Sequence, residues 1–451
     1  MSRAHAVSLA GSRPGRLVRA VAGPALALAL AVTVAAPAEA ANRVTPGDFT
    51  GYGFDQCTAP NQRAMNAWLN ASPYLAVGIY ISGDSRGCVR QPNLSPSWVR
   101  TQLANGWRLL PITLGPQAWC TTRERYLHQV RIDPRPADSY SRARRQGRDE
   151  AAKTVAAARA LGISAGSTLW YDIEAFDVSR HDCRESALSF LSAWTTRMHQ
   201  LHYVSGIYSS AASGIRMLDD ARVLRPGRYR MPDRVWIGDW NGRASASSSY
   251  VRGSGWTGHR RVHQYRGGHA ESHGGVTIDV DNDWVDLGRG SHIAGEPRHC
   301  GGAASYDHRT YASRGIGDRG ALVRTVQCLL KNKHRYDARV DGVYDAGLGA
   351  AVRKYRVSRG LPPDTRTGPR TWVALLSQGH APIVKVGSAS PSVRRLQRAL
   401  NAAERAGLTV TGVFDSATTR AVRGYQHHHP RLLETGVANG RVWVRLQAGL
   451  L

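Results

Sequence analysis

Lysine is scarce in this chain of 451 residues, since only five of its 60 basic residues are lysines and arginine supplies the rest. Because alanine and glycine are abundant as well, this bias indicates GC-rich codon usage before it indicates a function. Acidic residues are also few, 33 in all, which leaves a formal net charge of +27. Such a balance favours polyanionic partners, among which nucleic acid, anionic lipid and acidic cell-wall polymers all qualify.

Long apolar runs are missing after residue 36, so no later segment is expected to span a membrane. The first 19 residues hold four arginines and no acid, and they precede an apolar run over residues 20–36 and the sequence Ala38-Glu39-Ala40. This order predicts a secretory signal peptide over residues 1–40, cleaved after Ala40. An Arg-Arg pair is absent, which favours general secretion over twin-arginine export. An uncleaved membrane anchor is the alternative.

The sequence also lacks the C-x-x-C spacing of zinc sites, and its six cysteines make an even count. In an exported chain this count predicts three structural disulfides. Fifteen pairings are possible in principle. Our prediction keeps four cysteines in the first large segment and closes the last pair locally: Cys57 with Cys88, Cys120 with Cys183, and Cys300 with Cys328.

An exported protein of this charge is expected to be secreted and extracellular or cell-wall associated. Acidic polymers of the bacterial cell wall are then the expected partners, with no nucleic acid and no stable membrane insertion. The basic stretch Arg142-Ala143-Arg144-Arg145 lacks interleaved aromatic residues, which favours a solvated helix face over a nucleic-acid site. The sequence gives no indication of the oligomeric state.

The C-terminal third of the chain contains an internal repeat, found when the sequence is shifted against itself by 70 residues. Helical periodicity predicts a small all-α unit of three helices in each copy, over residues 315–380 and 386–451. Matching positions include Gln327 with Gln397, Gly342 with Gly412, Asp345 with Asp415, and Tyr355 with Tyr425.

Both copies share a pattern of Val-x-x-x-Gln-x-x-Leu, a Gly-x-aromatic-Asp turn and a segment with Val and an aromatic residue. This pattern resembles the peptidoglycan-binding-type-1 domain, which implies binding to peptidoglycan. The second copy departs from it, because Thr411 replaces the first Asp of the turn and His427-His428-His429-Pro430 interrupts the next segment. A pair of helical spacers without a ligand is the alternative.

Residues 41–288 form a larger unit in which strand-like runs alternate with segments of helical periodicity. The runs cover residues 51–55, 75–81, 109–114, 168–174, 204–208, 234–240, 262–265 and 276–281. Eight such runs predict an α/β fold, a (β/α)8 TIM-like barrel, with an open doubly wound sheet as the alternative. The later intervals are short, so reduced helices are expected there. Residues 289–314, rich in small and polar residues, are predicted to be a linker.

In a barrel of this kind the chemistry lies at the carboxyl ends of the strands. Acids and aromatic residues converge at those ends: Asp55, Asp172, Glu174, Tyr208, Asp239, Trp240, His263, Tyr265, Asp279 and Asp281. Hydrolysis of a glycosidic bond needs one carboxylic acid that protonates the leaving oxygen and a second carboxylate. Crowded carboxylates keep one member protonated, and aromatic faces pack against sugar rings. A solvated strand end or an ion pair with arginine is the alternative.

Several segments, among them Gly53-Phe54-Asp55-Gln56-Cys57, Tyr171-Asp172-Ile173-Glu174-Ala175 and His263-Gln264-Tyr265, resemble the bacterial glycoside-hydrolase-like family catalogued as domain of unknown function 1906. That family is similar to the family 25 glycoside hydrolases, lysozymes that cut between N-acetylmuramic acid and N-acetylglucosamine. Their Val-Asp-Leu-Asn motif of strand eight is matched by Ile278-Asp279-Val280-Asp281, where Asp281 replaces the usual Asn.

The resemblance implies roles for the acids at the barrel mouth. Glu174 would be the general acid, Asp172 a stabiliser or base, and Asp55 and Asp279 would shape the charge of the site. Substrate-binding roles are predicted for further residues at the strand ends: Tyr208, Asp239, Trp240, Gln264, Tyr265 and Asp281.

No cofactor and no metal are predicted. His259, His263, His269 and His273 have spacings that could suggest a metal, but two lie in a Gly-rich loop and no H-E-x-x-H helix is present. Two rivals to a hydrolase remain: a wall-binding or envelope-organising protein whose barrel grips glycan without cutting it, and an exported nuclease. An arginine that blocks Glu174 would favour the wall-binding protein.

Overall fold

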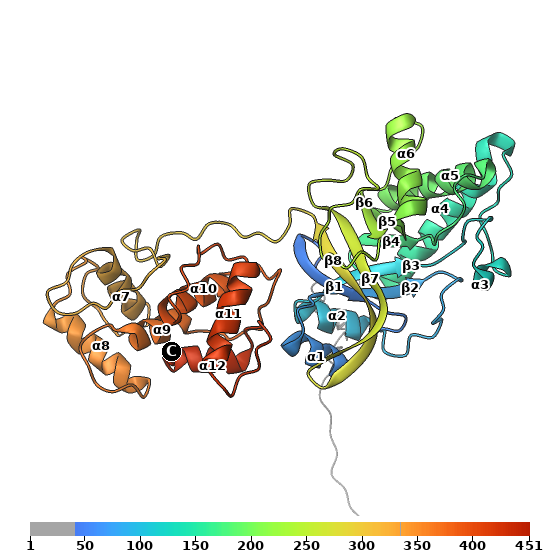
Figure 1. Ribbon diagram of the computed structural model, residues 1–451. Coiled ribbons are helices and arrows are strands. Elements are labelled where there is room, and N and C mark those ends of the chain that lie inside the picture. Colours follow the sequence, from blue (N-terminus) through green and yellow to red (C-terminus); the bar gives the residue numbers. More distant parts are fainter. Residues whose placement is uncertain (1–40, 334) are drawn as a thin grey trace, which may run out of the picture. The chain divides into compact units, whose positions relative to one another are not determined.

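The computed structural model describes residues 41–333 and 335–451 (Figure 1). The predicted signal peptide, residues 1–40, lies outside the described residues. Within the described ranges no helix is both long and apolar enough to cross a lipid bilayer.

Eight strands close into one barrel in the order of the sequence, and each predicted run overlaps one of them. The strands are β1 (Phe49–Asp55), β2 (Ala76–Ser82), β3 (Arg108–Thr113), β4 (Thr168–Asp172), β5 (Val204–Ser210), β6 (Arg234–Gly238), β7 (Arg260–His273) and β8 (Val276–Leu287). The predicted α/β barrel is therefore confirmed, and the open sheet is excluded.

The last strand departs from the ideal (β/α)8 pattern, because β8 is antiparallel to both of its neighbours, β1 and β7. Only Gly274 and Gly275 connect β7 to β8. Two residues suffice for an antiparallel hairpin, whereas a parallel crossover needs a dozen residues or more. The described residues 239–259 between β6 and β7 contain no helix, in line with the short intervals noted in the sequence.

Helices cover the first part of the barrel, and the longest two, α4 and α5, pack against each other. The helical elements are α1 (Gln62–Ala71), α2 (Pro96–Ala104), α3 (Glu124–Leu127), α4 (Ala137–Ala160), α5 (His181–Gln200), η1 (Ala211–Ile215) and α6 (Arg216–Leu224). Asn61 and Ser95 cap α1 and α2 by accepting backbone N–H groups. Large aromatic side chains, fully buried, fill the core: Trp68, Trp107, Trp170, Trp194 and Trp236.

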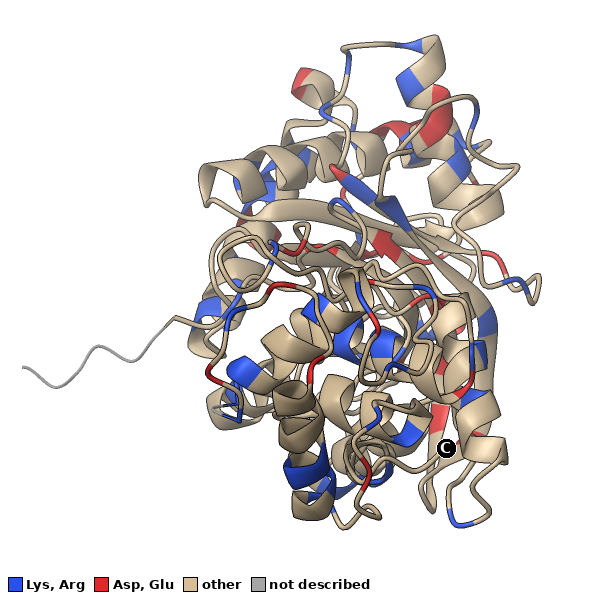
Figure 2. Cartoon of the chain, turned by 90° about the vertical axis from the view of Figure 1, so that its left-hand side faces the viewer, with Lys and Arg blue, Asp and Glu red and all other residues tan. Residues whose placement is uncertain are grey.

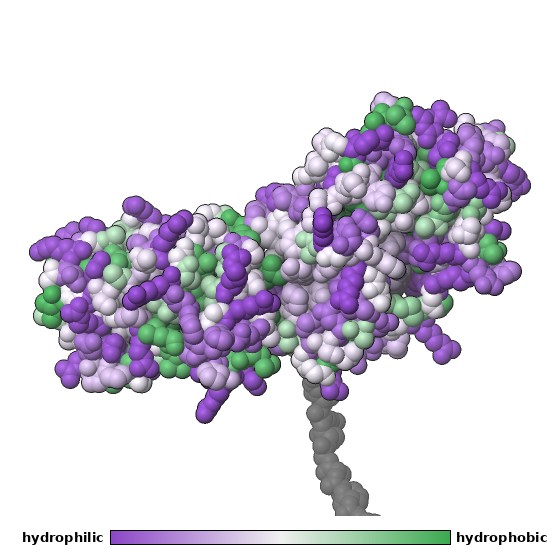
Figure 3. Space-filling view, viewed as in Figure 1, coloured by the Kyte–Doolittle hydropathy of each residue, from purple (hydrophilic) through white to green (hydrophobic). Residues whose placement is uncertain are grey.

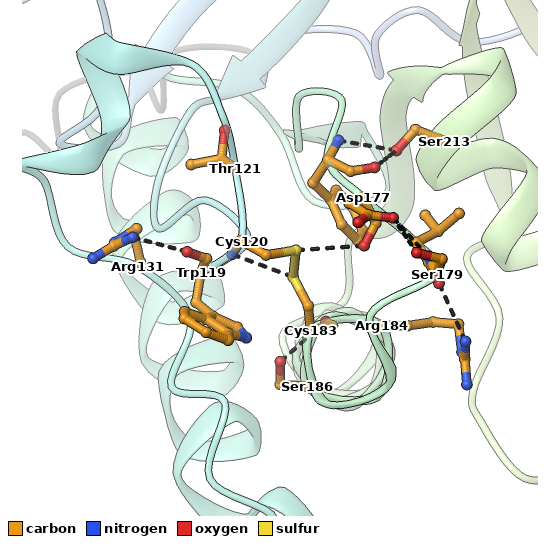
Figure 4. Close-up of a disulfide and its surroundings, with 12 residues drawn as sticks. Trp119, Cys120, Thr121, Arg131, Asp177, Ser179, Cys183, Arg184, Ser186 and Ser213 are labelled. Atoms are coloured by element: carbon orange, nitrogen blue, oxygen red, sulfur yellow. Dashed lines mark hydrogen bonds between the residues drawn. A yellow bond between two sulfur atoms is a disulfide. The ribbon is translucent and has the colours of Figure 1, made fainter.

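All three predicted disulfides are present: Cys57–Cys88, Cys120–Cys183 and Cys300–Cys328. The first joins the loops that follow β1 and β2. The second joins the loop after β3 to the first turn of α5 (Figure 4). Both therefore fix loops at the carboxyl ends of the parallel strands.

The two repeats are three-helix units, as predicted. The first contains α7 (Ala321–Lys331), α8 (Ala346–Ser358) and α9 (Pro369–Ser377), and the second contains α10 (Pro391–Ala403), α11 (Ser416–His427) and α12 (Gly440–Gln447). In both units one tryptophan from the last helix, Trp372 or Trp443, is fully buried.

A glutamine of the first helix organises the turn that follows it in each repeat. Gln327 accepts a hydrogen bond from Gly342 N at 2.8 Å and donates to Asp341 Oδ1 at 2.8 Å and Val343 O at 3.1 Å. Gln397 makes the same contacts in the second repeat, with Thr411 in place of the aspartate. The repeated motif thus has a direct role in folding.

Residues 289–314, predicted as a linker, contain no helix and no long strand. They are nevertheless packed: Tyr306 and Tyr311 are buried with the core of the repeats, and Ala312 O accepts from Trp372 Nε1 at 3.0 Å. The abundance of small residues predicted a loose segment, whereas two aromatic side chains supply enough apolar surface to anchor it.

Basic residues are spread over helices, strands and loops and do not gather in one patch in Figure 2. Apolar residues on the face seen in Figure 3 form small, scattered groups between hydrophilic ones. Neither view indicates one dominant interaction surface.

Candidate active site

A cavity of about 210 Å³ lies at the barrel mouth, and every one of the eight strands contributes one side chain to it. In strand order these side chains are Asp55, Tyr80, Ile112, Asp172, Tyr208, Trp236, Gln264 and Asp281. Three residues from the loops that follow strands complete the wall: Arg123, Glu174 and Trp240. A neighbouring cavity of about 150 Å³ shares Asp55, Tyr80, Glu174 and Asp281 with it.

Seven of the ten predicted site residues line this cavity: Asp55, Asp172, Glu174, Tyr208, Trp240, Gln264 and Asp281. Three do not. Asp239 accepts a hydrogen bond from Asn241 Nδ2 beside it, and the Tyr265 ring lies 6.4 Å from the His263 ring and does not line the cavity. Asp279 is exposed on the hairpin of β7 and β8.

The position of Asp279 follows from the antiparallel course of β8. Asp281 is the residue that stands opposite Asp55 in the sheet, and residues 276–280 continue beyond the mouth, paired with β7. The prediction had placed Asp279 among the central acids. In the structure Asp281 and Asp283 are the strand-eight acids at the mouth, two residues later than predicted. Because side chains alternate along a strand, a shift of two residues keeps them on the same face.

Asp283 is an acid that the sequence analysis missed. It is fully buried, accepts from Trp236 Nε1 at 2.9 Å, and shares a hydrogen bond with Asp55. Two carboxyl groups can share a hydrogen bond only if one of them carries a proton. The alternation of Asp279, Asp281 and Asp283 along one strand was the available signal.

The crowding of acids changes their protonation. Burial, together with the neighbouring Asp281 carboxylate, raises the pKa of Asp55 well above its usual range. Burial and the charges of Glu174 and Asp55 do the same to the pKa of Asp172. Burial and Asp279 raise the pKa of Asp281 to about 6. The mouth therefore holds protons at neutral pH on carboxyl groups that are normally ionised.

Gln264 connects the acids to the aromatic side of the cavity. Its Nε2 donates to Asp55 Oδ2 at 3.0 Å, and its Oε1 accepts from Tyr208 Oη at 2.9 Å and Trp240 Nε1 at 3.0 Å. Trp240 is 68% exposed, so its indole can offer a face to a ligand at the rim.

Two glycines make room for these groups. A Cβ on Gly78 would lie 2.4 Å from Asp55 Cβ, and a Cβ on Gly267 would lie 2.5 Å from the Trp240 ring. Any larger residue at either position would therefore displace the side chain beside it.

Glu174 lies two residues beyond the end of β4, and its backbone is fixed by Gln117. Gln117 Oε1 accepts from Glu174 N at 2.8 Å, while Gln117 Nε2 donates to Asp172 O at 2.9 Å. The Glu174 carboxylate pairs with Arg123 through an Nη2–Oε2 contact of 3.1 Å. Arg123 was not among the predicted residues, because it lies in a loop without a motif.

The four histidines with suggestive spacing do not converge. Both ring nitrogens of His263 contact backbone carbonyls, His269 and His273 pair with Glu271, and His259 pairs with Asp286. In the described part of the chain no group of three or more His, Cys, Asp or Glu residues is arranged to hold a metal ion.

Comparisons with known proteins agree with this architecture. Residues 66–285 match the model of the Rv2525c-like, glycoside hydrolase-like domain. Residues 319–375 and 389–446 each match the PG_binding_1 model of peptidoglycan binding domains. The chain thus carries an Rv2525c-like, glycoside hydrolase-like domain followed by two PG_binding_1 domains, and the family resemblance inferred from the sequence is confirmed.

Individual relatives share less with the chain. An uncharacterized protein in the bpoA1 3' region of Kitasatospora aureofaciens is 40% identical over 70 residues, which are 15% of this chain and 59% of that protein. The Tat-secreted protein Rv2525c of Mycobacterium tuberculosis is 12% identical, with 52% of this chain and 96% of that one covered and a TM-score of 0.34. A family 25 glycosyl hydrolase from Bacillus anthracis is 13% identical, with 52% and 89% covered and a TM-score of 0.32.

Proposed function

We propose that the protein is a secreted, wall-associated glycoside hydrolase that cuts the glycan strands of peptidoglycan in the manner of a muramidase. The observation that carries this proposal is the set of acids in one cavity of the barrel mouth, several of them with raised pKa values. The two PG_binding_1 domains and the three disulfides support action at the wall, outside the cytoplasm.

In this proposal Glu174 protonates the oxygen of the leaving sugar. Its side chain is 19% exposed at the cavity, whereas Asp55 and Asp172 are almost fully buried below it. Asp172, once it has given up its proton, stabilises the positive charge that develops on the sugar ring or activates water, which is the role of the second carboxylate in a glycosidase. Asp55 and Asp283, whose pKa values are raised well above their usual range, hold protons that limit repulsion between these acids.

The PG_binding_1 domains contribute by keeping the barrel on its polymer. A tethered barrel meets its substrate at a high effective concentration, so weak binding at the mouth is sufficient for turnover. Trp240 and Tyr208 supply aromatic surface for a sugar ring at the cavity.

One observation favours a second candidate, a glycan-binding barrel without turnover. Arg123 Nη2 lies 3.1 Å from Glu174 Oε2, so the carboxyl group proposed as general acid is engaged in an ion pair. The hydrolase proposal therefore requires that this ion pair opens when substrate binds.

The test is release of reducing ends and soluble muropeptides from purified peptidoglycan by residues 41–451. We expect release by the unaltered protein and a loss of at least about 100-fold in Glu174→Gln. Glu434→Gln, which removes an exposed acid of the second repeat, is the matched control and should act like the parent. If the parent protein sediments with peptidoglycan but releases nothing, the barrel is a binding module.

A further inference from the structure

Arg123 is held at the barrel mouth by a covalently fixed loop. The Cys120–Cys183 disulfide ties this loop to α5, and the carbonyl of Trp119 accepts from Arg131 Nη1 at 2.8 Å (Figure 4). Arg123 N in turn donates to Thr121 Oγ1 at 3.3 Å. The loop therefore presents the guanidinium at a defined place, even though the side chain itself is half exposed.

The ion pair of Arg123 with Glu174 leaves most of the guanidinium available. A single Nη2–Oε2 contact of 3.1 Å joins the two groups, while a guanidinium carries five N–H donors in a planar fork. Ion pairs with one partner half exposed are only weakly stabilising, so another carboxylate can replace Glu174 at little cost. A fork of this kind binds a free carboxylate through two parallel hydrogen bonds.

The remainder of the cavity wall offers an anion no second cation. Four of its eleven lining residues are acids, Asp55, Asp172, Glu174 and Asp281, and Arg123 is the only cation among them. A ligand that carries a carboxylate can enter in one orientation, with that group directed at Arg123. A neutral glycan gains nothing from this arginine.

We propose that Arg123 is a specificity residue that selects glycan bearing a carboxylate and, on binding it, releases Glu174. This inference rests on the proposed function and names its substrate more closely. Two groups in peptidoglycan offer the required chemistry: the lactyl carboxylate of a muramic acid without peptide, and a carboxylate of an attached peptide.

Release of Glu174 links recognition to chemistry. While Arg123 is paired, it holds the Glu174 carboxylate at the cavity wall. Once the ligand takes the guanidinium, Glu174 has no other cation among the residues that line this cavity and is free to approach the glycosidic oxygen.

The experiment measures equilibrium binding of soluble fragments to residues 41–451 by isothermal titration calorimetry. The probes are the disaccharide of N-acetylglucosamine and N-acetylmuramic acid, its methyl ester, and the same disaccharide with its lactyl group in amide linkage to a peptide. The proteins are the parent, Arg123→Gln, Arg123→Lys and Arg197→Gln. Arg197 lies in the last turn of α5, away from the mouth, and gives the same change of charge. Binding to the repeats is common to all four proteins and cancels in the comparison.

We expect the parent and Arg197→Gln to bind the acid at least about 10-fold more tightly than the ester, and Arg123→Gln to bind both alike. Arg123→Lys should retain part of the preference, since it keeps the charge but loses the fork. A preference shown only by the peptide-bearing disaccharide, and lost in Arg123→Gln, would support the proposal with the peptide as the source of the carboxylate.

Equal affinity for acid, ester and peptide form in the parent, or a preference that survives in Arg123→Gln, would overturn the proposal. Each result is separate from the hydrolysis test. If the parent prefers the acid but does not hydrolyse peptidoglycan, Arg123 is a specificity residue and the hydrolase proposal is wrong. If the parent hydrolyses peptidoglycan but shows no preference, the hydrolase proposal stands and the role of Arg123 is wrong.

Discussion

The barrel mouth and the turns of the two repeats are both built around polar side chains that the sequence motifs single out, yet the two regions treat those side chains differently. In the first repeat every polar atom of the Gln327 amide has a partner inside the fold. In the mouth, by contrast, Asp172 Oδ1 is buried without any hydrogen-bond donor among the described residues.

This contrast distinguishes two reasons why a polar residue can belong to a sequence motif: stability and function. Satisfied polar groups stabilise the native turn, because their loss would leave backbone groups unpaired. Buried carboxyl groups without donors destabilise the native barrel, since desolvation is not compensated. The fold does not need such groups, so their presence indicates a task that only a ligand completes.

The largest effect is expected for activity, in Asp172→Asn. Loss of the carboxylate should lower the rate of muropeptide release on the order of 1,000-fold, about 4 kcal/mol in the activation barrier. Thermal unfolding of the barrel should move to the same or a higher temperature, because a buried acid is removed. Reducing-end release measures the loss of activity, and calorimetric scans measure the unfolding temperature. A variant that loses activity because it has unfolded would contradict this contrast.

The reverse pattern is expected for Gln327→Ala in the first repeat. The change leaves Gly342 N and Val343 O without their partners, which should destabilise the unit by about 2–3 kcal/mol. Hydrogen exchange of amides in α7 and α8 reports on this unit alone, which matters because the chain has several domains. Hydrolysis of soluble muropeptides by the barrel should be unchanged. Gln200→Ala, at the exposed end of α5, is the control, and equal exchange in both variants would refute the role of Gln327.

The fold was accessible from the sequence because periodicity and motif spacing are local. Short strand-like runs located all eight strands, and the Gln and Gly of each repeat could be aligned by a simple shift. The course of β8 was not accessible in the same way, because the direction of a strand depends on the connection before it. Gly274-Gly275 is a hairpin signal, but the sequence analysis relied on the alternation of strands and helices and did not use it.

The unexpected direction of β8 also explains why the predicted set of site acids was partly wrong. Asp279 was taken as a central acid because strand eight was expected to end at the mouth, as parallel strands do. The antiparallel strand passes the mouth at Asp281 and carries Asp283 below it. Arg123 could not be found at all, since its meeting with Glu174 depends on a loop held by a disulfide 63 residues apart in sequence, and no local pattern encodes that contact.

A smaller effect is expected for the pH dependence of stability in the two regions. The folded pKa of Asp281, about 6, lies above its ordinary value of 3.8, so the native barrel binds this proton more tightly than the unfolded chain does. The free energy of unfolding of the barrel should therefore fall as pH rises from about 4 to about 7, by about 1–2 kcal/mol after allowance for solvent screening.

Hydrogen exchange of β1 and β8 amides across this pH range, corrected for intrinsic exchange, measures the change. Asp281→Asn should flatten the profile, although Asp55, Asp172 and Asp283, whose pKa values are also raised, leave part of the slope. Glu271, whose pKa is lowered to about 2, opposes this fall up to about pH 5 and contributes a constant amount above it, so the slope is read between pH 5 and pH 7. A barrel whose stability rises over the same range would contradict the assignment.

The smallest effect concerns the first position of the turn, where the two repeats differ. Asp341 Oδ1 accepts from Gln327 Nε2 and Val343 N at 2.8 Å each, whereas Thr411 Oγ1 accepts from Gln397 Nε2 at 3.3 Å and Val413 N at 3.1 Å. Shorter bonds to a charged acceptor are stronger. Thr411→Asp should therefore stabilise the second repeat by about 0.5 kcal/mol, and Asp341→Thr should destabilise the first by a similar amount.

The gain in Thr411→Asp is limited because the turn is exposed and water competes for the new carboxylate. Exchange of α10 and α11 amides would detect it, and the reciprocal change in the first repeat serves as its control. If both substitutions shift stability in the same direction, the two turns are not equivalent, and the matching hydrogen bonds of Gln327 and Gln397 do not carry the same share of stability.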